Sequence, residues 1–174
     1  VALLTPELRA RLAQLAQIDL STVSAAVFGE DAPALEVEWA LYIYQTLRSA
    51  TGAPVTREKE TTLPLVDAVS RNLVLVGTPE SNPLIKAVEA QLPASFTKLR
   101  KGHGLVAQVK DPTGYKGTVW LIVTGADTYG VERAASDFLY RYWRFAKEAV
   151  PFRKGMPPVE GSWMGTEPER SIPR

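Results

Sequence analysis

Two stretches of the chain share one pattern of apolar and polar positions. In the first, the apolar residues 73–76 end at Gly77, a pattern typical of a buried strand. Asn82 and Pro83 then occupy the positions of a helix N-cap and a first helical residue, and apolar side chains continue at helical spacing to Leu92, before Pro93 ends the predicted helix. The second stretch, 118–146, repeats the strand, the glycine and the helix, with Asp127 or Thr128 as the predicted N-cap.

Repeated strand–turn–helix units predict an α/β fold, in which helices flank a mixed, mostly parallel sheet in a single layered domain. Residues 104–109 are a further apolar run, which predicts a hairpin with 118–124 across a turn that contains Pro and Gly. The charged stretch 55–60 predicts a strand near an edge of the sheet. For 63–70 the pattern favours a short helix.

The two ends of the chain differ from this central part. Residues 6–18 have the leucine spacing of an amphipathic helix, 21–28 is predicted as a short helical piece, and 35–50 as a largely buried helix. Periodicity stops at residue 151, where proline and glycine become frequent. We therefore expect three parts: an N-terminal helical segment (1–33), the α/β domain (34–150) and a Pro/Gly-rich extended arm (151–174).

Composition excludes several classes of function. The formal net charge of +1 on 174 residues gives no field that would recruit nucleic acid. Cysteine is absent, which rules out disulfides and thiolate chemistry. No apolar run has the length of a membrane-spanning helix. Because the chain begins with Val1 and carries no signal peptide, we expect a processed product or a fragment of a longer protein.

The two glycine-ended strands give the one candidate ligand site. If they are parallel neighbours, their turns open at the same carboxyl edge, where α/β sheets place ligands. Each turn has two interpretations, a capped connector or a place where helix N–H groups hold an anion. Glu80 would repel a phosphate, and no P-loop spacing is present. The candidate ligand-binding residues are Gly77, Thr78, Ser81, Asn82, Gly125, Asp127 and Thr128.

Side chains for catalysis or metal binding are not grouped in the sequence. His103 is the only histidine, and it lies in a basic loop where we expect a solvated side chain. The aspartates are spread over separate elements, without the paired carboxylates of a glycosidase. We therefore expect no catalytic residue, no metal site and no cofactor, and predict that the chain is not an enzyme.

Aromatic residues near the C-terminus predict an interaction surface. The helical stripe that contains Phe138 cannot also bury Tyr140 and Trp143, and the arm carries Phe152 and Trp163. Aromatic side chains are enriched at protein interfaces. We expect Tyr140, Trp143, Phe152 and Trp163 to contribute to self-association, or to contact with another envelope protein, through the C-terminal arm.

Three segments resemble known families. The segment VLVGTPESNPLIKAVE resembles the VGGP-x-x-NPL stretch of α/β domains in archaeal surface-layer and envelope proteins, with Thr78 in place of the second glycine. GLVAQVKDPTGYKGTVWLIVTGADTYGVERAASDFL resembles the sequel in those domains, and similar strings occur in the regulatory subunit of bacterial cellulose synthase. WALYIYQTLRSATGAPV is similar to the non-catalytic domain before the barrel in some glycoside hydrolases.

These resemblances cover about residues 35–139 and imply a non-catalytic domain in an envelope or carbohydrate context. The expected function is a structural, self-assembling module of a cell envelope, surface layer or extracellular polymer, forming homo-oligomers outside the cell or at its surface. The alternative is a domain that binds a carbohydrate or small anion between the two turns, as an accessory part of a carbohydrate-active protein. We expect no nucleic-acid partner and no membrane span.

Overall fold

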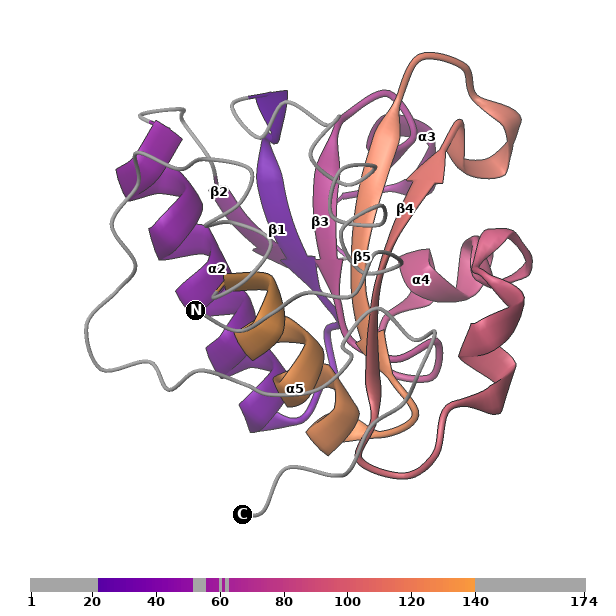
Figure 1. Cartoon of the computed structure of the whole chain (residues 1–174). Helices are drawn as coiled ribbons and strands as arrows, with labels where there is room; N and C mark the ends of the chain where they lie inside the picture. The colour runs from indigo at the N-terminus through magenta and orange to yellow at the C-terminus, as the bar shows by residue number, and fades with distance from the viewer. Residues whose placement is uncertain (1–21, 52–55, 60, 62, 140–174) are drawn as a thin grey trace, which may run out of the picture.

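The computed structural model describes residues 22–51, 56–59, 61 and 63–139 as an α/β domain around one five-stranded sheet (Figure 1). The strand order is β2-β1-β3-β5-β4, and every neighbouring pair is parallel except the β4–β5 hairpin. The mixed, mostly parallel sheet predicted from the sequence is confirmed. Its strands are β1 (Ala25–Phe28), β2 (Thr56–Lys59), β3 (Leu73–Val76), β4 (Gly104–Lys110) and β5 (Val119–Gly125).

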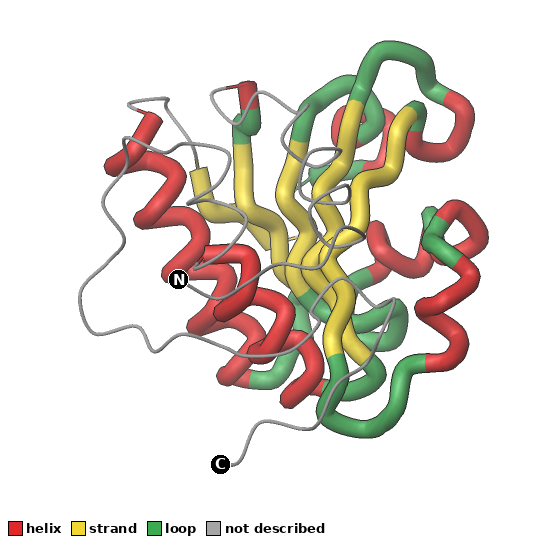
Figure 2. The backbone as a smooth tube through the Cα atoms, viewed as in Figure 1, coloured by secondary structure: helices red, strands yellow, loops and turns green. Residues whose placement is uncertain are grey.

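Helices cover both faces of the sheet (Figure 2). One face carries α2 (Ala34–Thr51) and α5 (Thr128–Asp137), which pack on each other as well as on the strands. The other face carries α3 (Leu65–Ala68), α4 (Pro83–Ala87) and the 3-10 turns η3 (Glu89–Gln91) and η4 (Ala94–Lys98). A further turn, η5 (Pro112–Gly114), lies in the hairpin between β4 and β5.

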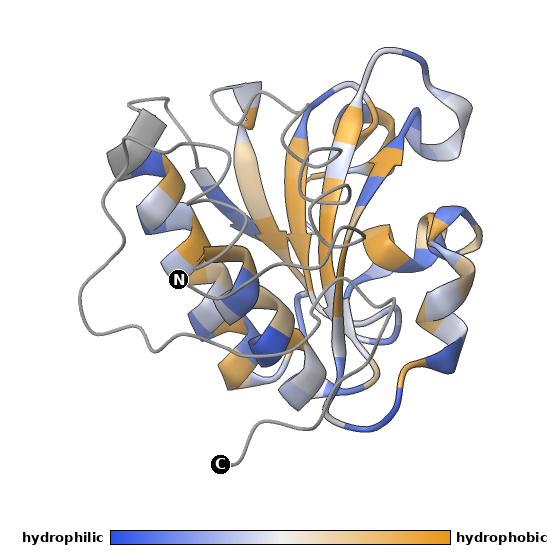
Figure 3. Cartoon of the chain, in the orientation of Figure 1, coloured by the Kyte–Doolittle hydropathy of each residue, from blue (hydrophilic) through white to orange (hydrophobic). Residues whose placement is uncertain are grey.

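The strand pleat divides the apolar side chains between two cores. Val74 and Val76 of β3 pack toward α2 and α5, whereas Leu73 and Leu75 pack toward α4. The hydropathy colouring shows apolar strands in the middle of the sheet and a polar β2 at its edge (Figure 3). This edge position confirms the prediction for 55–60 and agrees with the charged side chains of β2.

Two sequence predictions for secondary structure are corrected. Residues 21–28 are not a helical piece, because Ala25–Phe28 is β1, an interior strand that pairs with β2 and β3. A short apolar run does not distinguish strand from helix, and pairing on both sides decides it here. The helix that begins at Pro83 also ends early: α4 stops at Ala87 and a 3-10 turn follows.

Other predicted elements are found where expected, including α2, α3 and the β4–β5 hairpin. The expected N-terminal helix (6–18) and the arm (151–174) lie outside the described residues, as does the end of the last predicted helix (140–146). Within the part of the chain that the structure describes, no helix combines the length and hydropathy that crossing a membrane requires.

The connections create a point at which strand order reverses. From β1 the chain passes through α2 to β2 on one side, and it returns to place β3 on the other side of β1. The helices that follow β1 and β3 therefore leave toward opposite faces of the sheet. Open α/β sheets commonly bind ligands at the carboxyl ends of two such strands.

Candidate functional site

The two glycine-ended turns lie side by side, as the sequence predicts. β3 and β5 are parallel neighbours with Val76 opposite Val123, and the Gly77 amide donates to the Val123 carbonyl at 3.1 Å. The residues that follow each strand therefore meet at the carboxyl edge of the sheet. The polar side chains here are named the carboxyl-edge cluster: Glu36, Thr78, Ser81, Asn82, Asp127 and Thr128.

Glu36 joins the two turns, although no pattern in the sequence points to it. It lies in the first turn of α2 with only 1% of its surface exposed. Its Oε1 accepts a hydrogen bond from the Ser81 hydroxyl at 2.6 Å, and its Oε2 accepts one from the Thr128 hydroxyl at 2.8 Å. A glutamate at a helix start normally indicates an interaction with the helix dipole. Here its carboxylate fills the space between the candidate turns.

Asn82 caps α4 and also ties two strands together. Its Oδ1 accepts from the Leu84 amide at 3.1 Å, which confirms the predicted cap. Its Nδ2 donates to the carbonyls of Val27 and Val76, at the ends of β1 and β3, at 3.2 and 3.1 Å. Asn82 is fully buried. The amide side chain therefore occupies the strand-order reversal where a ligand would be expected.

A close approach of two backbones completes this closure. A Cβ atom placed on Gly29, directly after β1, would lie 1.6 Å from the Ser81 carbonyl oxygen. Within the β3 turn, the Thr78 amide donates to the Ser81 hydroxyl at 2.9 Å, and the Ser81 amide donates to the Thr78 hydroxyl at 3.1 Å. The turn is thus held by its own side chains.

Asp127, one of the two residues predicted as a cap, is the N-cap of α5. Its Oδ1 accepts from the Gly130 amide at 2.8 Å, and its Oδ2 accepts from the Gly102 amide at 3.1 Å, so it also fixes the loop before β4. Gly125 serves packing, because a Cβ there would lie 2.4 Å from the Gly130 carbonyl carbon. Thr128, the other candidate cap, instead binds Glu36.

His103 does not have the solvated side chain that the sequence suggested. Only 4% of its surface is exposed. It precedes the first residue of β4, and its carbonyl accepts from the Ala126 amide at 3.0 Å, which draws the loop against the β5 turn. The surrounding Lys and Gly residues predicted an open loop, whereas the edge strand and the start of α5 enclose it.

The cluster does not have the arrangement of a nucleophilic active site. Ser81 donates to a carboxylate, but that carboxylate is shared with Thr128, and the Ser81 oxygen also accepts from the Thr78 amide. Among the described residues, no three His, Cys, Asp or Glu side chains are grouped so as to hold a metal ion. The candidate interface residues Tyr140, Trp143, Phe152 and Trp163 lie outside those residues.

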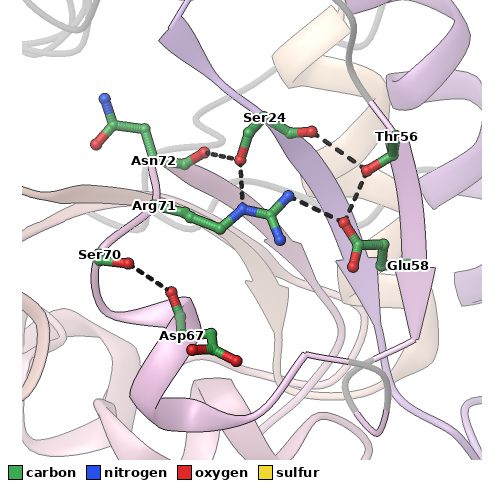
Figure 4. A network of polar contacts seen from close by, with 7 residues as sticks. All are labelled: Ser24, Thr56, Glu58, Asp67, Ser70, Arg71 and Asn72. Atoms are coloured by element: carbon green, nitrogen blue, oxygen red, sulfur yellow. Dashed lines mark hydrogen bonds and ion pairs between the residues drawn. The ribbon is translucent and has the colours of Figure 1, made fainter.

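A second polar group lies at the opposite, amino edge of the sheet (Figure 4). Arg71 donates through Nε to the Ser24 hydroxyl at 2.9 Å and pairs through a terminal nitrogen with Glu58 at 3.0 Å. Thr56 donates to the same Glu58 oxygen at 2.7 Å. With Asn72, whose carbonyl accepts from the Ser24 amide, these residues form the amino-edge network: Ser24, Thr56, Glu58, Arg71 and Asn72.

The network sets the charge state of Glu58. Burial raises the pKa of its carboxyl, but hydrogen bonds from Thr56 and Arg71 and the Arg71 charge together outweigh burial. The net result is a pKa below the ordinary value of 4.5. Glu58 is therefore a carboxylate near neutral pH, and the network ties β1 to β2 and to the segment that precedes β3.

Comparison of the sequence with protein-family models and with curated proteins gives no match.

Proposed function

We propose that this domain is a non-enzymatic structural module that assembles in a cell envelope or extracellular polymer. The observation that supports this proposal most is that side chains of the carboxyl-edge cluster form hydrogen bonds within the protein. Glu36, Asn82 and Asp127 each have protein donors and join segments far apart in the sequence. Groups satisfied in this way stabilise a fold, whereas catalysis needs groups directed at a substrate.

The envelope context comes from the family resemblance, and the assembly role comes from the arm. Residues 151–174 carry Phe152 and Trp163 in a proline-rich stretch that cannot form a core of its own. Burial of such side chains contributes about 25 cal/mol per Å² of apolar surface, which offsets ordering costs of about 1–2 kcal/mol per residue only against a preformed surface. We infer that the arm binds a neighbouring copy or another envelope protein.

Sedimentation of the full-length chain tests the assembly role. The double variant Phe152→Ser/Trp163→Ser should sediment as smaller species than the wild type, with an unchanged circular dichroism spectrum. A matched double variant at exposed polar positions, Lys98→Ser/Lys101→Ser, should leave sedimentation unchanged. An aromatic variant that sediments like the wild type would contradict assembly through the arm.

The alternative, binding of a carbohydrate or small anion, is favoured by one observation. Tyr129 is 53% exposed in the first turn of α5, next to Thr128 and Asp127. Exposed aromatic rings beside polar groups suit the apolar faces and hydroxyls of sugars. Amide shifts during titration with sugars and phosphate test it. Binding should perturb the β3 and β5 turns and weaken in Tyr129→Ala, but not in Tyr115→Ala at the opposite edge.

A further inference from the structure

The Glu36 carboxylate has the contacts of a bound ligand. Each of its oxygens accepts one hydroxyl hydrogen bond, and the two donors are Ser81 in the turn after β3 and Thr128 at the start of α5. Its side chain is buried in the first turn of α2. We propose that the Ser81 and Thr128 hydroxyls form a carboxylate-binding site, which the domain fills with its own Glu36.

The surroundings suit a carboxylate. The Ser81 oxygen accepts from the Thr78 amide at 2.9 Å, which leaves the hydroxyl hydrogen of Ser81 free to point at Glu36. Gly77 provides the room, since a Cβ on it would lie 3.2 Å from Glu36 Oε1 and 2.8 Å from the Ser81 hydroxyl. Two hydroxyl donors, and the absence of a side chain at Gly77, thus leave room for the two carboxylate oxygens.

Occupation by Glu36 has a consequence for free ligands. An intramolecular group competes at a high effective concentration, so a small carboxylate in solution cannot displace it from the folded wild type at ordinary concentrations. The site is accessible only after Glu36 is removed. This inference is independent of the proposed assembly role, because it rests on the contacts of Glu36 alone.

Chemical rescue of Glu36→Ala tests the proposal. The substitution deletes a methylene and a carboxylate, which together have the non-hydrogen atoms of acetate. We expect the thermal unfolding midpoint to fall by about 5 °C or more, because two hydroxyls lose their acceptor beside a cavity. Sodium acetate in the millimolar range should then raise the midpoint of Glu36→Ala, and sodium chloride at equal ionic strength should not.

Three matched variants separate a built site from a general salt effect. Glu132→Ala removes a carboxylate that accepts from the Trp39 indole at 3.2 Å, and acetate should leave its midpoint unchanged. In Glu36→Ala/Thr128→Val, one donor is lost and the response to acetate should shrink. The glutamine of Glu36→Gln occupies the same space as the glutamate, so this variant should be destabilised without responding to acetate.

The outcomes that overturn the proposal are specific. Acetate that stabilises Glu132→Ala or Glu36→Gln as much as Glu36→Ala would show that the effect is not local. If acetate leaves the unfolding midpoint of Glu36→Ala unchanged, the Ser81 and Thr128 hydroxyls do not form a carboxylate-binding site. If Glu36→Ala does not fold in buffer, its refolding yield is compared in sodium acetate and in sodium chloride. A higher yield in acetate supports the site, and equal yields reject it.

Discussion

The two edges of the sheet each contain one of the two asparagines of the chain, and the two side chains are used differently. Asn82, at the carboxyl edge, is fully buried and donates to the carbonyls of Val27 in β1 and Val76 in β3 while it caps α4. Asn72, at the amino edge, is partly exposed, donates to the Thr22 hydroxyl and accepts from the Val119 amide. Both join segments that are far apart in the sequence, but only Asn82 does so in a fully buried position.

The same contrast extends to the residues around them. Glu36 and Asp127 bury their carboxylates against hydroxyls and amides at the carboxyl edge. At the amino edge, Val66 of α3 is 76% exposed, and Tyr115 in the hairpin is 48% exposed. A closed polar cluster stabilises the fold, whereas exposed apolar side chains are available to a partner. The carboxyl edge also exposes one aromatic ring, Tyr129 at 53%, so the two edges differ in how their polar groups are bonded rather than in exposed aromatic rings.

The largest loss of stability is expected when a side chain is added where two backbone segments meet at the carboxyl edge. Gly29→Ala would place a Cβ 1.6 Å from the Ser81 carbonyl oxygen, so the two backbones must separate. We expect a loss of about 3 kcal/mol or more in the free energy of unfolding, measured by urea denaturation. Gly114→Ala is the control, since its Cβ meets nothing within 4 Å and only its positive φ of 89° is strained. It should cost about 1 kcal/mol.

Replacement of each asparagine by alanine is expected to give the next largest loss of stability. Asn82→Ala removes a cap and two hydrogen bonds to strand ends in a buried position, and we expect a loss of about 2–3 kcal/mol. Asn72→Ala should cost about 1 kcal/mol because water replaces its partners. Asn82→Asp retains the cap acceptor but lacks the donors. If Asn82→Asp is as stable as the wild type, the strand-joining role is wrong.

A smaller effect is expected from Glu58 at the amino edge, and it depends on pH. Because the folded-state pKa is lowered, the stabilisation from Glu58 is present above about pH 4.5 and is lost as pH falls through the lower value. Glu58→Gln should cost about 0.5–1 kcal/mol at pH 7 and nothing near pH 2, since the group is partly exposed. A pH-independent difference in urea denaturation would show that the ion pair with Arg71 is not the cause.

The smallest effect on stability is expected where the amino edge is most exposed. Val66→Ser should change the free energy of unfolding by less than about 0.5 kcal/mol, since its side chain lies largely in solvent. Val69→Ser, on a buried position after the same helix, should cost several times more. If Val66 contributes to the assembly surface, Val66→Ser reduces the sedimentation coefficient of the assembled species. An unchanged coefficient would remove Val66 from that surface.

Local sequence patterns predicted those residues whose hydrogen-bond partners lie only a few positions away in the chain. Asn82 before Pro83 was predicted as a cap, and Asp127 as one of two candidate caps, because a cap bonds to the first turn of its own helix. The order of apolar strands and capped helices was enough for the α/β fold. β1 was missed because four apolar residues, AAVF, become a strand only through their pairing with β2 and β3.

Long-range partners could not be predicted in this way. Glu36 bonds residues 45 and 92 positions away, and its place in the sequence is that of an ordinary helix start. The second role of Asn82 likewise depends on Val27, 55 positions before it. His103 was expected in solvent because the residues around it are basic and glycine-rich. Its burial depends on segments that pack over the loop, which the local sequence does not show. The two turns and the Asn82 cap were thus located correctly, but Glu36, which joins the two turns, was not.

Native-state hydrogen exchange tests the central claim most directly, that the carboxyl edge is closed by its own side chains and the amino edge is not. The amides of Thr78, Leu84 and Gly130 at the carboxyl edge donate to side-chain oxygens, as do those of Thr113 and Gly117 in the hairpin. The first three should exchange only through global unfolding, and the hairpin pair through local opening at lower free energy. Carboxyl-edge amides that exchange as fast as the hairpin amides would contradict the account.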